Sequence, residues 1–274
     1  MSNHLFALQS DFGYTDGRAA DLAGNILKLC PDASIYSVMH ALPKGDVPSA
    51  ALMIYSVLHF WPEGTIYVSI VEEDGAKGRP CAAYTVDNKY ILTPDNGALS
   101  SWLDLYGVKE LRALDLSLVP EGVEPYSYFA GALGSGKLAF ADVGPAYPAA
   151  EAVRFKLMAP TVEDGYVKCV PFSVLRTFGN LNLNVLIDDF AKSGIAIGDN
   201  VTVTITRKGE TLFEGRMPYN LSFGFAELGA PILFNGSNGF MGMGLNQENF
   251  AMAYMPESLQ AGCDFNEYVI EIKK

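Results

Sequence analysis

The chain has 274 residues, of which 49% are hydrophobic and 18% charged, and this globular composition excludes a disordered, collagen-like or coiled-coil protein. Its 31 acidic residues outnumber the 19 lysines and arginines, so the formal net charge of −12 disfavours nucleic acid and anionic membrane surfaces as partners. The longest apolar stretch, residues 49–61, is too short to span a membrane, and the N-terminus has no secretion signal, so a cytoplasmic protein is expected.

Apolar runs of strand length alternate with helical patterns in the first half of the chain. In chain order they predict strands and helices at residues 5–8 (strand), 18–30 (helix), 34–39 (strand), 47–60 (helix), 65–71, 81–86 and 90–93 (strands), 97–106 (helix) and 110–114 (strand). This alternation is typical of βαβ units, and the near-continuous apolar strand at 66–71 favours a parallel sheet covered by helices on both faces. We therefore expect an α/β domain over residues 1–148.

The pattern changes at about residue 151. Short strand candidates at 182–187, 201–207 and 211–215 are separated by glycine-containing turn signals, which predicts an all-β second half. The Pro-rich segment 141–150 has no periodicity and is interpreted as a linker. The second domain is accordingly expected over residues 149–274. Four widely spaced cysteines and three histidines predict neither a metal site nor a disulfide framework.

Two clusters of charged residues follow predicted strands, where open α/β sheets bind ligands. In the first, Asp11 and Asp16 flank a flexible glycine, so one carboxylate could accept hydrogen bonds from a sugar diol while the other pairs with a cationic group. The alternative for Asp16 is that it only caps the following helix. The second cluster contains Glu72 and Arg79 and is either a site loop or a solvated charged loop.

Three further segments combine polar and aromatic groups with turn residues. Residues 93–99, with Asp95 and Asn96, form a turn before a helix. In residues 177–184, Phe178 and Asn180 could stack on and hydrogen-bond a purine, although Asn next to Gly is also typical of turns. The Gly-rich run 235–246 permits close approach of a ligand to the backbone, or serves the bends of a barrel.

Taken in order, these segments resemble motifs of the S-adenosyl-L-methionine hydroxide adenosyltransferases and the related fluorinases and chlorinases. Six segments carry the resemblance, over nearly the whole chain: residues 10–16 (family T-D-F-G-x-x-D), 39–47 (His and a Pro-rich turn), 62–68 (P-E-G-T-V-x-V), 94–97 (P-D-N-G), 178–184 (F-G-N-x-x-x-N) and 235–239 (N-S-x-G). The resemblance implies an N-terminal Rossmann-like α/β domain, a C-terminal β-barrel domain and a homotrimer with sites between subunits.

The resemblance also implies S-adenosylmethionine as a small-molecule substrate, with no separate cofactor. Water or halide would attack the ribose 5′ carbon and methionine would leave. Asp11 would hold the ribose hydroxyls and Asp16 would face the methionine end. The other candidate ligand-binding residues, by position in the motifs, are Asp95, Asn96, Tyr128, Phe129, Phe178, Asn180, Ser237, Asn238 and Asn246.

The chain departs from the family in its water-holding triad of Asp, Arg and His. Arg79 matches the Arg, and Glu72 stands seven residues earlier in place of the Asp, so these two are the candidate catalytic residues. The family His is replaced by Phe129, which removes the obvious proton acceptor. Just before Phe178, where the family has an Asp that holds the methionine ammonium, this chain has Arg176 instead. Three functions therefore stay open: a hydrolase forming adenosine and methionine, a halide-using enzyme, and a non-catalytic protein that binds an adenosyl ligand.

Overall fold

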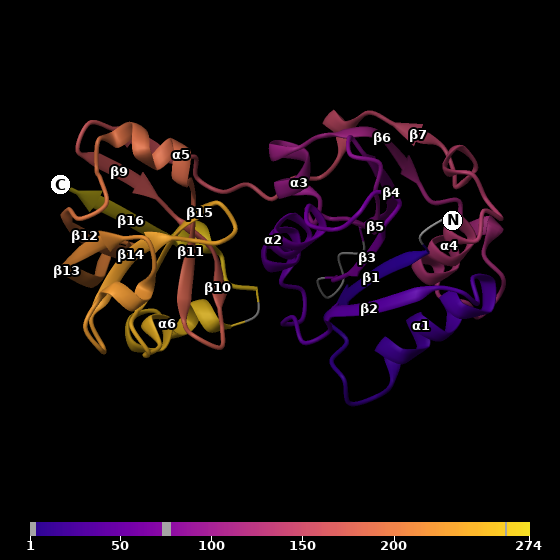
Figure 1. The fold of residues 1–274 in the computed structure, drawn as a ribbon, viewed down its shortest axis with the longest axis horizontal. Coiled ribbons are helices and arrows are strands. Elements are labelled where there is room, and N and C mark those ends of the chain that lie inside the picture. The colour runs from indigo at the N-terminus through magenta and orange to yellow at the C-terminus, as the bar shows by residue number, and fades with distance from the viewer. Residues whose placement is uncertain (1–3, 73–77, 261) are drawn as a thin grey trace. The chain divides into compact units, whose positions relative to one another are not determined.

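A computed structural model describes residues 4–72, 78–260 and 262–274 (Figure 1). The chain divides into two compact units, Met1–Phe155 (unit 1) and Lys156–Lys274 (unit 2). Unit 1 therefore continues past residue 148, the boundary expected from the sequence. The segment interpreted as a linker, residues 141–150, belongs to unit 1, because its strand β7 pairs with β6 through Tyr147 and Leu111.

Unit 1 is built on a mixed seven-stranded sheet of order β2-β1-β3-β5-β4-β6-β7. Its strands are β1 (Leu5–Ser10), β2 (Ser34–Met39), β3 (Ile66–Ile70), β4 (Arg79–Thr85), β5 (Tyr90–Asp95), β6 (Val108–Ala113) and β7 (Ala146–Tyr147). The strands β2, β1, β3 and β5 are parallel, as expected, but β4 is antiparallel to both of its neighbours. The connection from Thr85 to Tyr90 is too short for the crossover that a parallel pair requires, so these two strands form a hairpin.

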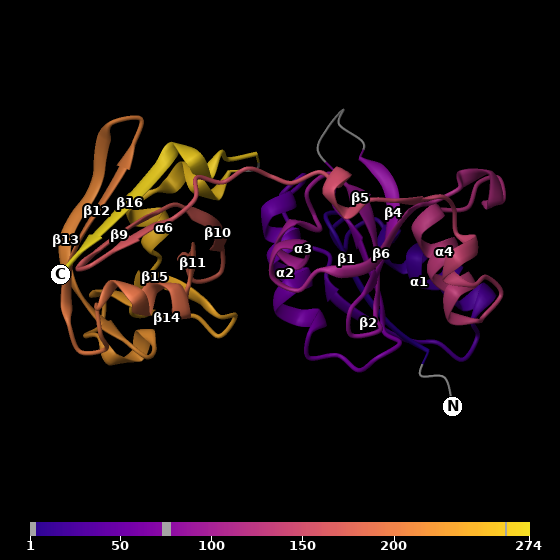
Figure 2. The same cartoon turned by 90° about the horizontal axis from the view of Figure 1, so that it is seen from above.

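Helices cover both faces of this sheet, as Figures 1 and 2 show. On one face, α1 (Arg18–Leu29) and α4 (Pro125–Gly134) pack over a core that includes Phe6, Leu92 and Phe129. On the other, α2 (Val47–Leu58) and α3 (Ser100–Leu105) enclose a second core. Capping residues start two of these helices: Asp46 accepts the Ser49 N–H, and Glu124 accepts those of Tyr126 and Ser127. The layered α/β arrangement expected of the first half is thus present.

Unit 2 is built on a nine-stranded sheet of order β10-β11-β15-β14-β13-β12-β16-β9-β8. Its strands and helices are β8 (Thr161–Glu163), β9 (Tyr166–Cys169), β10 (Pro171–Leu175), β11 (Asn180–Leu186), α5 (Ile187–Phe190), β12 (Asn200–Arg207), β13 (Glu210–Asn220), β14 (Pro231–Asn235), β15 (Phe240–Leu245), α6 (Phe250–Tyr254) and β16 (Tyr268–Lys273). All neighbouring strands are antiparallel except the pair β13 and β14. The second half is therefore sheet-rich, as predicted, with two short helices in addition.

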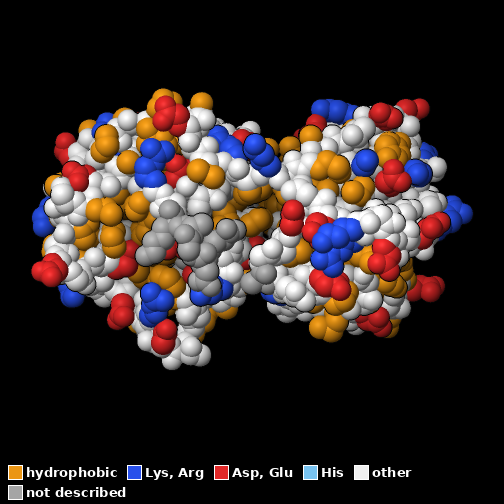
Figure 3. Space-filling model, turned by 180° about the vertical axis from the view of Figure 1, so that it is seen from behind, with side chains coloured by type: hydrophobic (Ala, Val, Ile, Leu, Met, Phe, Trp, Pro, Cys, Tyr) orange, Lys and Arg blue, Asp and Glu red, His pale blue; other side chains and the backbone are white. Residues whose placement is uncertain are grey.

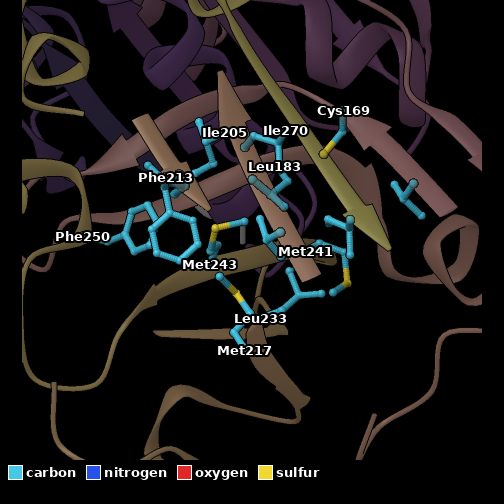
Figure 4. Packing of buried hydrophobic residues seen from close by; sticks show 14 of the residues in the cluster. Cys169, Leu183, Ile205, Phe213, Met217, Leu233, Met241, Met243, Phe250 and Ile270 are labelled. Carbon is cyan, nitrogen blue, oxygen red and sulfur yellow. The ribbon is translucent and has the colours of Figure 1, made fainter. Parts of the chain in front are cut away.

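The sheet of unit 2 curls around a single hydrophobic core. Figure 4 shows side chains from β9, β11, β12, β13, β14, β15, β16 and α6 pointing toward one another, among them Leu183, Ile205, Met241 and Ile270. Phe213 and Phe250 close one end of this core, with their ring centroids 5.3 Å apart. Burial of this inner face is the main force that holds the strands together.

The charge on the surface and the apolar content of the helices are those expected from the composition. On the face shown in Figure 3, acidic and basic side chains are interspersed over both units. Within the three described ranges, no helix has the length and apolar character needed to cross a membrane.

Candidate active site

Three of the polar residues singled out in the sequence lie where parallel strands of unit 1 end. Asp11 follows β1, Glu72 follows β3 and Asn96 follows β5, which places them at one edge of the sheet. Two hydrogen bonds join these strand ends: the Asp11 N–H donates to the Ile70 carbonyl at 3.3 Å, and Asn96 Nδ2 donates to the Val71 carbonyl at 2.8 Å. The fold thus gathers these groups at the edge where open α/β sheets bind ligands.

The two aspartates of the first cluster have different surroundings. Asp11 is half-buried, and its Oδ2 accepts the Gly45 N–H at 3.0 Å, which leaves acceptor positions on both oxygens. Asp16 is exposed and accepts the N–H of Arg18, the first residue of α1, at 3.2 Å. The N-cap of α1 is Gly17, so Asp16 contacts the first helical N–H from one residue before the cap and is not itself the capping residue.

Arg79 is held by two residues of unit 1. Its Nη2 donates to Asp95 Oδ2 at 2.9 Å, and its guanidinium carbon lies 3.7 Å from the centre of the Tyr147 ring. The hydrogen bond that Arg79 donates to Asp95 raises the pKa of Arg79 above its ordinary value. The Asp95 side chain is 3% exposed, whereas that of Arg79 is 44% exposed. The pair consequently has a buried anion that anchors a cation open to solvent.

Glu72 is not the ion-pair partner of Arg79. Its side chain is half-buried and makes no hydrogen bond or ion pair within the described part of the chain. The acidic residues beside it that the sequence also suggested, Glu73 and Asp74, lie outside the described residues. Among the described residues at this edge, one carboxylate is therefore bonded to Arg79, whereas that of Glu72 has no hydrogen-bond or ion-pair partner.

Tyr126, at the start of α4, is a neighbour of Glu72 that sequence reasoning missed. The residue is 4% exposed, and its hydroxyl has no hydrogen-bond partner among the residues described. Burial raises its pKa well above the ordinary value, and the charges of Cys81 and Glu72 add to this effect. The phenol therefore stays protonated and can only donate a proton to a hydrogen bond or accept one through its oxygen lone pairs.

Tyr128 and Phe129 lie further along α4, inside unit 1. Phe129 is fully buried in the core over the sheet, and Tyr128, 8% exposed, packs edge-on against it with ring centroids 5.4 Å apart. At the position where the resemblance implies a histidine, this chain thus has a packed aromatic ring with no group that takes up a proton.

The remaining candidates belong to unit 2. Phe178, just before β11, is 64% exposed, whereas Asn180 at the start of β11 is 7% exposed. Asn238 Nδ2 donates to Asn182 Oδ1 at 3.1 Å, and Asn246 Nδ2 donates to the Ala226 carbonyl at 2.7 Å. Ser237 is exposed in the turn between β14 and β15. Phe178 and Ser237 are therefore free to meet a ligand, while Asn238 and Asn246 use their amides to hold unit 2 together.

Metal-ligand groups are not among the features of the site. Within residues 4–72, 78–260 and 262–274, no group of three or more His, Cys, Asp or Glu side chains is placed to hold a metal ion.

Comparison with known proteins decides the family. The family model "SAM hydroxide adenosyltransferase N-terminal domain" matches residues 6–131, and the corresponding C-terminal domain matches residues 176–258. The chain belongs to the SAM hydroxide adenosyltransferase family. The two matched regions fall within unit 1 and unit 2 respectively.

Relatives within this family carry two different names. The chain is 27% identical to a fluorinase of Actinoplanes sp., with 95% of this chain and 96% of the relative covered. A fluorinase of Nocardia brasiliensis is 28% identical, with 94% of each chain covered. This chain is also 29% identical to an (R)-S-adenosyl-L-methionine hydrolase of Salinispora arenicola, over 66% of this chain and 72% of the relative.

A solved structure has the same fold. An uncharacterized conserved protein from Thermotoga maritima superposes with a TM-score of 0.83 at 23% identity, over 98% of this chain and all of the other. It confirms that this SAM hydroxide adenosyltransferase family member has the mixed α/β architecture with two large sheets.

Proposed function

We propose that this protein hydrolyses S-adenosylmethionine to adenosine and methionine. Water attacks the ribose 5′ carbon, the bond from that carbon to the sulfonium sulfur breaks, and methionine leaves as a neutral thioether while the water gives up one proton. Membership of the SAM hydroxide adenosyltransferase family and the hydrolase relatives support this reaction. Such a displacement depends mainly on holding a desolvated nucleophile in line with the leaving sulfur.

The observation that carries the proposal is the position of the Glu72 carboxylate, which has no hydrogen-bond or ion-pair partner within the described residues, at the sheet edge that also carries Arg79. Arg79 is neutralised by Asp95, so Glu72 is left without an ion-pair partner among the described residues. In this role Glu72 accepts the proton of the attacking water, and the free N–H groups of Arg79 hold its oxygen. Glu72 thereby takes over the task for which the family uses a histidine and which Phe129 does not perform.

The other residues bind the substrate. By resemblance to the family motifs, Asp11 holds the ribose hydroxyls and Asp16 faces the methionine end. Phe178, Asn180 and residues 237–246 contact the adenosine. We also propose a homotrimer in which unit 2 of a neighbouring copy completes the site, with a Rossmann-like unit 1 and a β-barrel in unit 2. The exposed Phe178 ring supports an adenosine contact, since aromatic faces stack on bases.

The fluorinase relatives support a second candidate, in which a halide replaces water. They match the chain over nearly its full length, and an aromatic Phe129 in place of histidine suits an enzyme that needs no base. The acidic edge with Asp11 and Glu72 opposes it, because carboxylates without a cationic partner among the described residues repel an anion. A third candidate, binding without turnover, follows from the same loss of the histidine.

One incubation separates the three candidates. Purified protein is incubated with S-adenosylmethionine, with and without chloride or fluoride, and the nucleosides are separated by chromatography. We expect adenosine at a halide-independent rate that is lost in Glu72→Gln and strongly reduced in Arg79→Ala. A halogenated nucleoside would establish the halide reaction. S-adenosylmethionine recovered intact from the protein would establish binding alone, and full activity of Glu72→Gln would disprove the role of Glu72.

A further inference from the structure

Arg79 is exposed yet well restrained. Its hydrogen bond to Asp95 uses Nη2 at 2.9 Å, and its side chain is 44% exposed. A guanidinium has five N–H donors in a rigid plane, so most of them remain available on the exposed side. Which way they point depends on what fixes the plane of the group.

Tyr147 fixes that plane. The Arg79 guanidinium carbon lies 3.7 Å from the centre of the Tyr147 ring, which is contact distance for a cation on an aromatic face. Tyr147 belongs to the edge strand β7, and Leu111 of β6 is its register partner. The ring is therefore supplied by a strand of the sheet, which makes it a firm platform.

Asp95 connects the platform to the cation. The Tyr147 hydroxyl donates to Asp95 Oδ2 at 3.2 Å, and this same oxygen accepts from Arg79. Asp95 Oδ1 accepts the Val153 N–H at 2.8 Å. Register places the carboxylate at this point, because Asp95 of β5 lies directly opposite Arg79 of β4. Each of the three side chains thus contacts the other two, and the buried carboxylate bonds to both Arg79 and Tyr147.

We infer that Tyr147 and Asp95 are positioning residues that hold the Arg79 guanidinium in the orientation the reaction needs. The inference rests on the proposed function, since it assigns Arg79 to the attacking water. An unrestrained arginine samples many rotamers, and catalysis falls when a group that contacts the nucleophile is not held in place. In this arrangement Asp95 serves the substrate through Arg79, whereas the sequence suggested a direct ligand contact.

The test compares two variants with a matched control. Tyr147→Leu removes the aromatic platform, and Tyr147→Phe keeps it while deleting the bond to Asp95. Tyr84 of β4 is the control, because its ring also carries a cation, Lys109 Nζ at 4.8 Å, and its hydroxyl also donates a hydrogen bond, to Asn88 at 2.8 Å. Tyr84→Leu thus makes the same chemical change away from Arg79.

We expect kcat to fall roughly 3- to 30-fold in Tyr147→Leu, because this range corresponds to the loss of one cation–π contact. KM should change by less than about twofold. Tyr147→Phe retains kcat within about threefold, and Tyr84→Leu retains it fully. Equal rates in Tyr147→Leu and the native protein would overturn the inference. So would an equal loss in Tyr84→Leu, which would indicate a general effect on the fold.

Nuclear magnetic resonance supplies a readout that does not depend on turnover. The Tyr147 ring shifts the side-chain proton signals of Arg79 upfield, and this shift is expected to persist in Tyr147→Phe and vanish in Tyr147→Leu. If the native protein forms no adenosine, the proposed hydrolysis is wrong, and the positioning of Arg79 is then judged by this shift. An upfield shift of the Arg79 signals in the native protein and in Tyr147→Phe supports the inference, and its absence from the native protein overturns it.

Discussion

The Ser10 hydroxyl and the His40 imidazole lie 2.7 Å apart, Oγ to Nδ1, although 30 residues separate them in the sequence. They join the ends of β1 and β2, next to Asp11. His40 is 2% exposed, and burial lowers its pKa below the ordinary value of 6.5. The imidazole is therefore neutral at pH 7 and is held by a hydrogen bond in a buried position.

This burial predicts a pH dependence of stability. Because the folded pKa of His40 lies below 6.5, the unfolded chain binds the extra proton more readily as the pH falls. The contribution of His40 to the free energy of unfolding is therefore fully present above the unfolded pKa of 6.5. It decreases as the pH falls from 6.5 toward the folded pKa. Urea titrations of the native protein and His40→Asn across this window measure it. The variant should lack this decrease, and an identical slope in both proteins would contradict the assignment.

Carboxylates affect the stability of the fold in a separate, more acidic pH range. Asp199 and Glu267 have pKa values lowered from 3.8 and 4.5, chiefly by a backbone N–H in the first case and by Lys208 in the second. The stability that they add is lost only as the pH falls below those ordinary values. Measurements above pH 5 consequently report His40 alone among these three groups.

A second prediction concerns the unpartnered hydroxyl of Tyr126. Removing it in Tyr126→Phe deletes no hydrogen bond within the described residues, so the free energy of unfolding should stay unchanged or rise by up to about 1 kcal/mol. Tyr67→Phe is the control, since this fully buried tyrosine donates to Gln9 Oε1 at 2.7 Å. It should lose about 1 to 3 kcal/mol, because Gln9 is left unsatisfied. Urea denaturation measures both, and equal losses would show that the Tyr126 hydroxyl has a partner.

The sequence identifies a helix well where one face is apolar and the other polar. The helix predicted at 18–30 is α1, Arg18–Leu29, whose buried residues Leu22 and Ile26 lie four positions apart. Helix α4 was not predicted, because seven of its ten residues are buried and two are glycines, so it has no polar face to produce a helical period. Burial on all sides removes the signal on which such predictions depend.

Contacts between strands were harder to predict than the strands. The resemblance to the family triad suggested Glu72 and Arg79 as a catalytic pair, but the antiparallel register of β4 and β5 puts Asp95 opposite Arg79. Tyr147 joins them from a further 52 residues beyond Asp95. Pairing register depends on which strands become neighbours in the sheet, and spacing within one segment carries no information about that.

A third prediction tests Phe178 as a ligand contact. Because its ring is 64% exposed, Phe178→Ser should change the free energy of unfolding by less than about 0.5 kcal/mol. The same change should weaken S-adenosylmethionine binding by about 5- to 100-fold, the loss of one stacking contact. Calorimetric titration and urea denaturation measure the two quantities. Leu228→Ser, at 74% exposed, is a control expected to alter neither. Unchanged affinity in Phe178→Ser would remove this residue from the site.

A fourth prediction follows from the close packing of Asn180 on Gly244. A Cβ added at Gly244 would lie 2.1 Å from Asn180 Oδ1, so Gly244→Ala must displace the Asn180 side chain. Overpacking of this kind costs about 1 to 3 kcal/mol, and we expect S-adenosylmethionine binding to weaken as well. Gly224→Ala is the control, because the nearest atom to its added Cβ is 3.9 Å away.

A double variant identifies the clash as the cause. If Asn180 is the obstacle, shortening it in Asn180→Ala makes room for the methyl group at 244. The double variant should then be about as stable as Asn180→Ala alone, so the two changes are not additive. Affinity should not recover, because the Asn180 amide is missing in both proteins. Additive losses of stability would place the strain of Gly244→Ala elsewhere, and restored affinity would show that the adenosyl ligand does not use Asn180.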